Sequence, residues 1–493
     1  MTARRIGPRE LTRLLGSWPT SGQAAYVALA ARVRLLVLDG RLPVGVRLPP
    51  ERELAAALGI SRTTISAAYD LLRTSGHAAS RQGSGTWTAL PATGTDVPTW
   101  APEPAPAGVL DLAHAGPPAP PQLHAAYAAA LDDLPRLLPG TGYDYHGLPA
   151  LRLRLAERFT ERGLPTSPEQ VLITSGALQA VRLALTLVVD PGDRVLVEQP
   201  GYPNAMDVVT DLGGRLVPVP MSFGQNAGSA AWDLDGIDAA VRQTAPRAAY
   251  LIPDFQNPTG ALMSAADRGR VASLMQRSRT LVVVDETLVE LGLDGVEARP
   301  FASFGPFADA GAVTVGSASK VFWGGLRVGW LRSDAATVAR LAALRSRQDL
   351  SSPVLEQLAC AHLMDALDAV RAHRVEQLRS QRDALVDLLR RHLPAWRFAV
   401  PSGGQVLWCS LPGPWAAAVC DAAAERGLRL TPGSRFAADG TLESWLRLPF
   451  TRPVPELGQA VPLLADAWGQ VVSAAGAPTS GMGVGLAVDP YVV

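Results

Sequence analysis

Residues 316–330 read GSASKVFWGGLRVGW, and Lys320 in this stretch is the only lysine in a chain of 493 residues. The other 44 of the 45 lysine and arginine side chains are arginines. A guanidinium stays protonated in proteins, whereas a primary amine can lose its proton and attack a carbonyl. The alternative is a surface lysine left by chance, but the small and apolar neighbours of Lys320 argue against it. The stretch therefore predicts that position 320 needs a nucleophilic amine.

The composition is that of a soluble globular protein with about two to four domains. Hydrophobic residues make up 47% of the chain and charged residues 18%. We find neither an uninterrupted apolar run long enough for a membrane span nor the features of a signal peptide. The three cysteines, Cys360, Cys409 and Cys420, have no metal-binding or redox spacing, so we expect buried thiols. These features predict a cytoplasmic protein without a metal site or a membrane partner.

Charge is distributed unevenly along the chain. Residues 1–90 contain 12 arginines and 5 acidic residues, a net charge of +7, so the remaining 403 residues carry −7. A basic head on an acidic body suggests that the head binds a polyanion. Scattered, solvated arginines are the alternative explanation.

The pattern in residues 22–90 predicts three helices followed by a hairpin. The first helix covers roughly 22–39, the second lies in LPPERELAAALG and ends at Gly59, and the third begins after the N-cap Ser61 and ends at Gly76. The apolar face of the first helix comprises Tyr26, Leu29, Val33 and Leu36. That of the third comprises Ile65, Ala68, Tyr69 and Leu72. This order is that of a winged helix-turn-helix.

The head resembles the DNA-binding domain of GntR-type bacterial regulators over RLPPERELAAALGISRTTISAAYDLLRTSGHAASRQGSGTW. A winged helix-turn-helix places the first turn of its third helix in the major groove. The residues expected at the DNA are Arg52, Ser61, Arg62, Thr63, Thr64, Arg81 and Gly83. A winged helix used only for protein contacts is the alternative. The partner expected is double-stranded operator DNA.

Beyond a Pro- and Ala-rich linker, short β-branched runs alternate with helical patterns. The clearest strands are VLITS (171–175), RVLVEQ (194–199), AAYLIP (248–253), TLVVVDE (280–286) and AVTVGSAS (312–319). Long helices between strands predict an α/β fold with a mostly parallel sheet covered on both faces. In such folds, ligands bind at the carboxyl ends of the strands.

Residues with suitable chemistry follow these strands. Gly176, Ala177 and Leu178 open a helix, where backbone amides can bind a phosphate. Tyr202 offers an aromatic face for stacking, and Asn257 offers a hydrogen-bond donor. Asp285 places a carboxylate at the end of an apolar strand, where an unpaired charge is costly and a pyridinium nitrogen would be a suitable partner. Arg327 offers a further phosphate contact.

This set resembles the fold-type I aminotransferase superfamily, whose cofactor is pyridoxal 5′-phosphate (PLP). The resemblance implies that Lys320 forms the Schiff base and that Asp285 pairs with the ring nitrogen. It also implies that Asn257 contacts the ring hydroxyl, and that Tyr202 stacks on the ring. The phosphate would be held by Gly176, Ala177, Leu178, Ser317, Ser319 and Arg327. Arg447, in SWLRLPF, would bind the carboxylate of an effector, with a structural strand arginine as the alternative.

One departure from the family pattern concerns the ring hydroxyl. Family members usually have a tyrosine two or three residues after the aspartate, and here those positions are Thr287 and Leu288. The cofactor can still bind without that phenol. Efficient transamination is less secure, so residual aminotransferase activity is left open.

Together the two halves resemble the MocR group of bacterial transcriptional regulators. The expected organisation is a winged helix-turn-helix in 1–87, a linker in 88–110, a PLP-binding aminotransferase-like domain with a smaller C-terminal α+β part in 111–470, and a tail in 471–493. Disorder is one interpretation of that tail. The resemblance implies a homodimer with a head-to-tail arrangement.

The expected function is transcriptional control by PLP, or by PLP joined to an amino compound. The regulated genes would serve vitamin B6 synthesis or the metabolism of amines and amino acids. A working aminotransferase with a DNA-binding head is one alternative. A dimerisation module that has lost its cofactor is the other.

Overall fold

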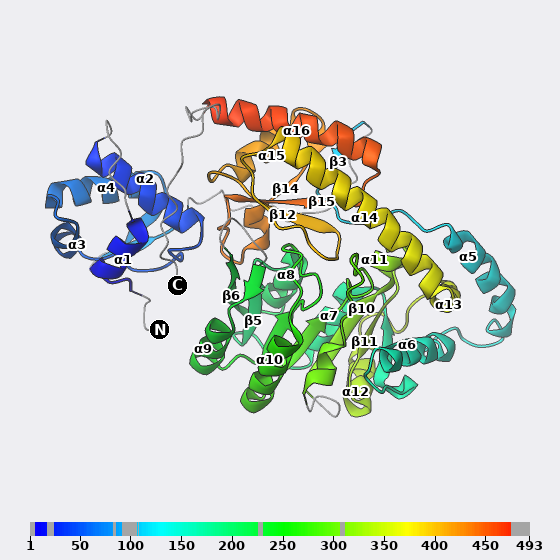
Figure 1. Ribbon diagram of the computed structural model, residues 1–493. Helices are drawn as coiled ribbons and strands as arrows, with labels where there is room; N and C mark the ends of the chain where they lie inside the picture. The colour runs from blue at the N-terminus through cyan, green and yellow to red at the C-terminus, as the bar shows by residue number, and fades with distance from the viewer. Residues whose placement is uncertain are drawn as a thin grey trace.

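The computed structural model describes residues 5–16, 24–81, 85–90, 106, 108–224, 230–305 and 311–474. Within these residues the chain forms a small helical head and a larger body with two parts (Figure 1). None of the described helices is both long and apolar enough to cross a membrane.

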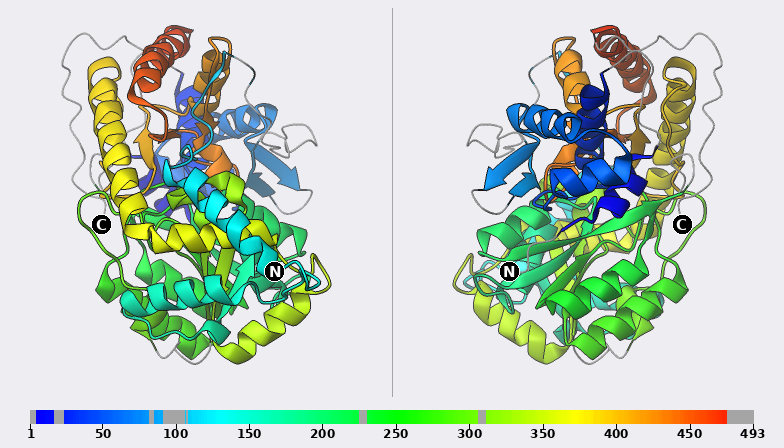
Figure 2. Two further views of the ribbon diagram at one scale, coloured as in Figure 1. Left: turned by 90° about the vertical axis from the view of Figure 1, so that its right-hand side faces the viewer. Right: turned by 90° about the vertical axis from the view of Figure 1, so that its left-hand side faces the viewer.

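The head contains four helices and a two-stranded hairpin. Their bounds are α1 Pro8–Leu15, α2 Ala25–Leu38, α3 Glu51–Leu58, α4 Arg62–Thr74, β1 Ala78–Arg81 and β2 Gly85–Thr88. Helix α3 ends at Gly59, which adopts a left-handed conformation with a φ of 66°. The hairpin extends away from the body (Figure 2).

The predicted helix α4 is confirmed, including its cap and its buried face. The Ser61 hydroxyl accepts a hydrogen bond from the Thr64 backbone amide, and the residues buried on α4 are Ile65, Ala68, Tyr69 and Leu72. Two features of the head, an additional helix and the exposure of Tyr26, differ from what the sequence predicted. Helix α1 was not predicted, and Tyr26 is 40% exposed because it lies in the first turn of α2, beside the solvent-exposed start of that helix.

The larger part of the body is built on a mixed sheet of eight strands. The strand order is β4 Val171–Thr174, β11 Gly329–Arg332, β10 Ala312–Ser317, β9 Leu281–Asp285, β8 Ala248–Leu251, β5 Arg194–Gln199, β6 Arg215–Phe223 and β7 Ala230–Trp232. The central pairs are parallel, and β11 and β7 run antiparallel to their neighbours. The five strands predicted from the sequence are all present, whereas β6, β7 and β11 were not predicted.

Helices cover both faces of this sheet because successive strand residues point to opposite sides. Val195 and Val197 pack with one set of helices, and Leu196 between them packs with the other. The first face carries α7 Ala177–Thr186, α8 Pro203–Asp211 and α12 Ala335–Arg345. The second carries α9 Leu234–Thr244, α10 Ala265–Ser278 and the short helix η3 Phe301–Phe304. The predicted two-sided α/β layering is therefore confirmed.

A separate helical layer lies at the edge of the sheet around β4. It contains α5 Gln122–Asp133, α6 Pro149–Glu161, α11 Ala318–Val321 and α13 Val354–Asp365. The one-turn helices η1 Leu134–Arg136, η2 Pro168–Gln170 and η5 Gly324–Leu326 connect these elements.

The smaller part of the body is an α+β unit formed mainly by the C-terminal region. It contains α14 Leu367–His392, β12 Val406–Ser410, α15 Ala416–Ala424, β13 Leu428–Arg429, β14 Thr431–Pro432, η6 Gly433–Phe436, β15 Trp445–Pro449 and α16 Val454–Ala474. Strand β3 Leu110–Asp111 joins it by pairing with β13, and α14 runs between the two parts of the body (Figures 1 and 2). Helix α16 continues four residues into the segment expected to be the tail.

Candidate functional site

A cavity of about 460 Å³ lies at the carboxyl ends of the parallel strands. The expected cofactor residues that line it are Ala177, Leu178, Tyr202, Asn257, Asp285, Ser317, Ser319, Lys320 and Arg327. Gly176 is the remaining expected residue, and it is the N-cap immediately before Ala177. Ala115, Asn204 and Gln405 also line the cavity and were not expected from the sequence.

The floor of the cavity is formed by Asp285, which ends β9 and is 5% exposed. One carboxylate oxygen, Oδ1, accepts a hydrogen bond from the backbone amide of Thr287 at 2.9 Å. The other, Oδ2, accepts one from the phenol of Tyr250 at 2.6 Å. Both oxygens therefore have donors, as a buried carboxylate requires. Tyr250 could not be identified from the sequence, because it lies on the neighbouring strand β8, 35 residues away.

Lys320 lies on α11, just after β10, with its amine in the cavity. Its Nζ donates a hydrogen bond to the carbonyl oxygen of Ala115 at 2.7 Å. Burial and, to a lesser extent, the cation of Arg447 lower the pKa of Lys320 from 10.5 to about 8, and the carboxylate of Asp285 opposes both. A lysine in this environment gives up its proton much more readily than an ordinary lysine, which suits it to act as a nucleophile.

The start of α7 supplies the expected phosphate-binding end of the cavity. Its N-cap Gly176 has a φ of 101°, and a Cβ there would lie 2.5 Å from Nη2 of Arg327. That same Nη2 donates to the carbonyl of Ser175 at 3.0 Å. Opposite, the hydroxyl of Ser317 accepts from the Ser319 amide at 3.1 Å. The start of α7, the hydroxyl-bearing Ser317 and Ser319, and the guanidinium of Arg327 therefore line the same cavity, and the positive φ at Gly176 disfavours other residues at this N-cap.

Arg447 lies on β15 and is buried, with 8% of its surface exposed. Its Nη1 donates to Oδ1 of Asn257 at 3.4 Å, and its Nη2 donates to the carbonyl of Ala113. The guanidinium also lies 4.8 Å from the ring centroid of Phe436, and its Nε has no hydrogen-bond partner among the residues that the structure describes. Burial lowers the pKa of Arg447 to about 10.

Three cations bind the backbone of residues 112–118, which we call the anchor segment. Arg447 binds the Ala113 carbonyl, Lys320 binds that of Ala115, and Arg374 binds that of Pro118 at 2.7 Å. The anchor segment directly follows β3, and the chain before β3 leads to the head. Two of the expected ligand-binding side chains therefore hold backbone that follows the linker and β3 along the chain.

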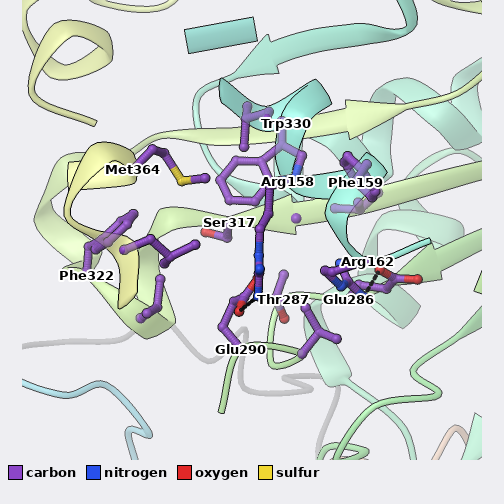
Figure 3. A pocket seen from close by; sticks show the side chains of 16 residues that line it. Arg158, Phe159, Arg162, Glu286, Thr287, Glu290, Ser317, Phe322, Trp330 and Met364 are labelled. Atoms are coloured by element: carbon purple, nitrogen blue, oxygen red, sulfur yellow. Dashed lines mark hydrogen bonds and ion pairs between the residues drawn. The ribbon is translucent and has the colours of Figure 1, made fainter. Parts of the chain in front are cut away.

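A second, enclosed cavity lies behind Thr287 and Ser317, which line both cavities (Figure 3). The volume of this cavity is about 30 Å³, much less than that of the first. Two ion pairs border it, Arg158 with Glu290 at 2.7 Å and Arg162 with Glu286 at 2.9 Å (Figure 3). The charged groups that border this cavity are thus paired with one another.

The first turn of α4 presents the expected DNA-contacting residues. Arg62 and Thr63 are exposed, and Thr64 is half-buried. Arg62 forms an exposed ion pair with Glu51 of α3 at 3.2 Å, and Arg52 on that helix is exposed. Ser61 serves as the N-cap of α4.

The wing supplies the remaining expected DNA contacts. Arg81 ends strand β1, and Gly83 lies outside the described residues.

The head contacts the body through the C-terminal end of α2. The Ser444 hydroxyl donates to Oδ1 of Asp39 at 2.7 Å, and the Leu442 amide donates to the Leu38 carbonyl at 2.8 Å. Burial raises the pKa of Asp39, and the hydrogen bond from Ser444 opposes this shift. Ser444 is three residues before Arg447, so the residue that contacts the head and the expected effector-binding arginine lie close together in the sequence.

A winged helical head joined to a parallel-sheet body, with a reactive lysine and a buried aspartate at the strand ends, defines a DNA-binding domain fused to an aminotransferase-type fold. The family described as "Aminotransferase class I and II" matches residues 140–461, and "Bacterial regulatory proteins, gntR family" matches residues 25–87. The chain belongs to the aminotransferase class I and II family and carries a gntR-family domain at its N-terminal side.

Individual relatives agree with both halves. The chain is 34% identical over 298 residues to the 2-aminoadipate transaminase of Thermus thermophilus, covering 59% of this chain and 73% of that protein. It is 29% identical to the probable rhizopine catabolism regulatory protein MocR of Rhizobium meliloti, covering 75% and 78%. The crystal structure of the α-aminoadipate aminotransferase LysN of Thermus thermophilus, complexed with N-(5′-phosphopyridoxyl)-L-leucine, matches with a TM-score of 0.68 and 28% identity, covering 75% and 94%.

Enzymes of this family depend on PLP, and the residues of the cavity fit that cofactor. A primary amine, a carboxylate and an aromatic ring share one cavity, as an aldehyde, a ring nitrogen and a flat ring require. Ala177 and Leu178 at the start of α7 line the cavity together with Arg327, so the start of a helix and a guanidinium are available to a phosphate. The residues of the cavity therefore suit the aldehyde, the ring and the phosphate of PLP.

Proposed function

We propose that the chain is a DNA-binding transcriptional regulator whose body binds PLP through Lys320 and senses PLP or an amino compound joined to it. One observation carries the proposal. Lys320 and Arg447, which would bind cofactor and effector, both hold carbonyls of the anchor segment that leads to the head. Occupancy of the cavity is thereby linked to the connection between head and body.

Each cavity residue has a role in this proposal. PLP supplies an aldehyde that a primary amine can capture and an electron-withdrawing pyridinium ring. Lys320 provides the amine, and Asp285 faces the ring nitrogen with its negative charge. Tyr202 packs against the ring, and Asn257 contacts the ring hydroxyl.

The phosphate is bound by the start of α7, with Gly176, Ala177 and Leu178, and by Ser317, Ser319 and Arg327. Arg447 binds the carboxylate of an effector, for which a bidentate guanidinium is suited.

Capture of the aldehyde would change the hydrogen bonding of Lys320. In the structure its ammonium donates to Ala115. Once that nitrogen is covalently bound to the cofactor, it has at most one proton left to donate. An effector carboxylate at Arg447 would likewise compete with the Ala113 carbonyl. Both events weaken the hold on the anchor segment, and so the head is released or repositioned.

The partners that we propose are operator DNA and a second copy of the chain. The head binds operator DNA through the first turn of α4, with Arg52, Arg81 and Gly83 near the phosphates. A homodimer with a head-to-tail arrangement would present two heads to paired half-sites. The regulated genes would serve vitamin B6 synthesis or the metabolism of amines and amino acids.

The test is binding of the full chain to DNA from upstream of its own gene, with PLP added or withheld. We expect a sequence-specific complex whose dissociation constant changes with PLP. The matched control is Lys320→Arg, which keeps a cation near Ala115 but cannot capture an aldehyde. This variant should bind the same DNA without responding to PLP. Absence of a sequence-specific complex under every cofactor condition would rule out the regulator.

A second function, turnover as an aminotransferase, is favoured by the readily deprotonated amine of Lys320. Positions 287 and 288 carry no phenol, which argues against efficient turnover. Steady conversion of amino donors and keto acids by the wild-type chain, abolished in Lys320→Ala, would establish this activity.

A further inference from the structure

Tyr250 is a buried tyrosine whose phenol contacts Asp285, one of the residues that line the cavity. It lies on β8, is 2% exposed, and is not among the residues that line the cavity. Its hydroxyl donates to Oδ2 of Asp285 at 2.6 Å. Such a short bond to an ionised acceptor is among the stronger hydrogen bonds in proteins.

The strand register explains how these two residues meet. Strands β8 and β9 are parallel, and Tyr250 pairs with Val283, two residues before Asp285. Residues two apart on a strand point to the same face, so the long tyrosine side chain can reach diagonally to the aspartate. On its other oxygen Asp285 accepts the Thr287 amide at 2.9 Å. Two donors from different elements therefore fix one carboxylate.

We propose that Tyr250 is a positioning residue that holds the Asp285 carboxylate ionised and in one orientation toward the ring nitrogen of PLP. This inference rests on the proposed binding of PLP at Lys320. Burial, reinforced by the charge of Asp285, raises the pKa of Tyr250 well above its ordinary value. The phenol therefore keeps its proton at neutral pH and remains a hydrogen-bond donor there.

The same bond tunes the charge that the cofactor meets. A donated hydrogen bond withdraws negative charge from a carboxylate and weakens it as a base. Tyr250 would thus reduce the negative charge that Asp285 presents to the cofactor, and would also fix the orientation of the carboxylate. The other ionisable groups near the phenol are Glu198 on β5 and Tyr202 at the start of α8, and those near Lys320 are Asp285 and Arg447. None of these groups donates a hydrogen bond to Oδ2 within the described residues.

The test compares the wild-type chain with Tyr250→Phe, each loaded with PLP. The measured quantity is the visible absorbance of the bound cofactor as a function of pH. Without the phenol, the Asp285 carboxylate carries more negative charge, so the ring nitrogen of the cofactor should bind its proton more tightly. We expect the midpoint of the titration to move upward by up to about one pH unit, a tenfold change in proton affinity.

Two further variants make the result decisive. Tyr69→Phe removes an equally buried phenol, which donates to the Pro49 carbonyl in the head at 2.9 Å, and should leave the midpoint unchanged. Replacing Tyr250 by 3,5-difluorotyrosine keeps its shape but strengthens the donor, so the midpoint should move downward. This second variant decides the matter if Tyr250→Phe fails to fold.

The outcomes separate this inference from the proposed function. Borohydride reduction of wild-type protein followed by peptide mass analysis should find a pyridoxyl group on Lys320. If that adduct is missing, the proposed function fails, and the role of Tyr250 fails with it. If the adduct forms but neither Tyr250 variant moves the midpoint, or both move it in one direction, only the positioning role is overturned.

Discussion

The ionisation of Lys320 should control how fast the chain captures PLP. Burial and Arg447 lower the pKa of this lysine from 10.5 to about 8, against the influence of Asp285. At pH 7 about 10% of such an amine is neutral, compared with about 0.03% of an ordinary lysine. The neutral amine is the nucleophile, so its availability is roughly 300 times greater than in an exposed lysine. The capture rate should therefore rise about tenfold per pH unit at low pH and level off above about pH 8.

Two substitutions should move this profile in opposite directions. Arg447→Gln removes a neighbouring cation, so the ammonium of Lys320 becomes easier to maintain and the midpoint should rise. Asp285→Asn removes the neighbouring anion, so the midpoint should fall. Each shift should be about one pH unit, the size expected for a single nearby charge.

The assay mixes PLP with unloaded full-length protein and follows the visible absorbance in a stopped-flow instrument. PLP has ionisations of its own, so the same pH series is run with the amide of N-acetyl-lysine and used as the reference. Lys320→Arg provides the blank, since it cannot capture the aldehyde. A wild-type midpoint near that of the free lysine derivative would refute the reasoning. Shifts of equal sign in Arg447→Gln and Asp285→Asn would refute it as well.

Three other substitutions test the surroundings of the two sites. In Gly329→Ala the new Cβ would lie 2.5 Å from the carbonyl carbon of Gly176, so displacement of the α7 start should weaken PLP binding at least about tenfold in equilibrium dialysis. Gly269→Ala, which meets nothing within 4 Å, is its control, and equal affinities would contradict the phosphate assignment. Ser61→Ala removes the cap of α4 and should cost about 1 kcal/mol in urea unfolding of the head, and an unchanged midpoint would contradict this. Arg52→Ala should reduce the salt dependence of DNA binding by about one phosphate contact, and an unchanged slope would remove it from the interface.

The features that sequence could predict are those determined locally. The cap at Ser61 depends on residues three positions apart, and the buried face of α4 follows from helical periodicity alone. The strands ending at Asp285 and Ser317 are rich in valine and buried almost throughout, as expected of strands covered on both faces. The ends of such strands are where polar ligand-binding residues are expected, so most of the cavity could be identified before the fold was known.

The features that sequence could not predict depend on contacts between distant segments. Tyr250 reads as one more residue in an apolar strand, and only the register between β8 and β9 brings it to Asp285. The anchor segment is rich in proline and alanine, so nothing in its side chains indicates that its carbonyls are ligands of Lys320 and Arg447. Strand β11 reads GWLR, in which a glycine and an arginine interrupt any apolar run and no residue is β-branched, so its pattern does not indicate a strand.

The presence of a single lysine among 44 arginines has a physical explanation with two parts. In the unloaded chain, position 320 must supply a cation that donates to the Ala115 carbonyl, and an arginine could do this as well. The same position must also release its proton in a buried site and attack an aldehyde, and a guanidinium cannot. Only an amine can exchange the backbone carbonyl for the cofactor. A regulator that responds to PLP through the anchor segment requires both properties in one side chain, whereas a purely structural contact requires only the first. Lys320→Arg therefore separates the two, because it should preserve the folded head and body while abolishing the response to PLP.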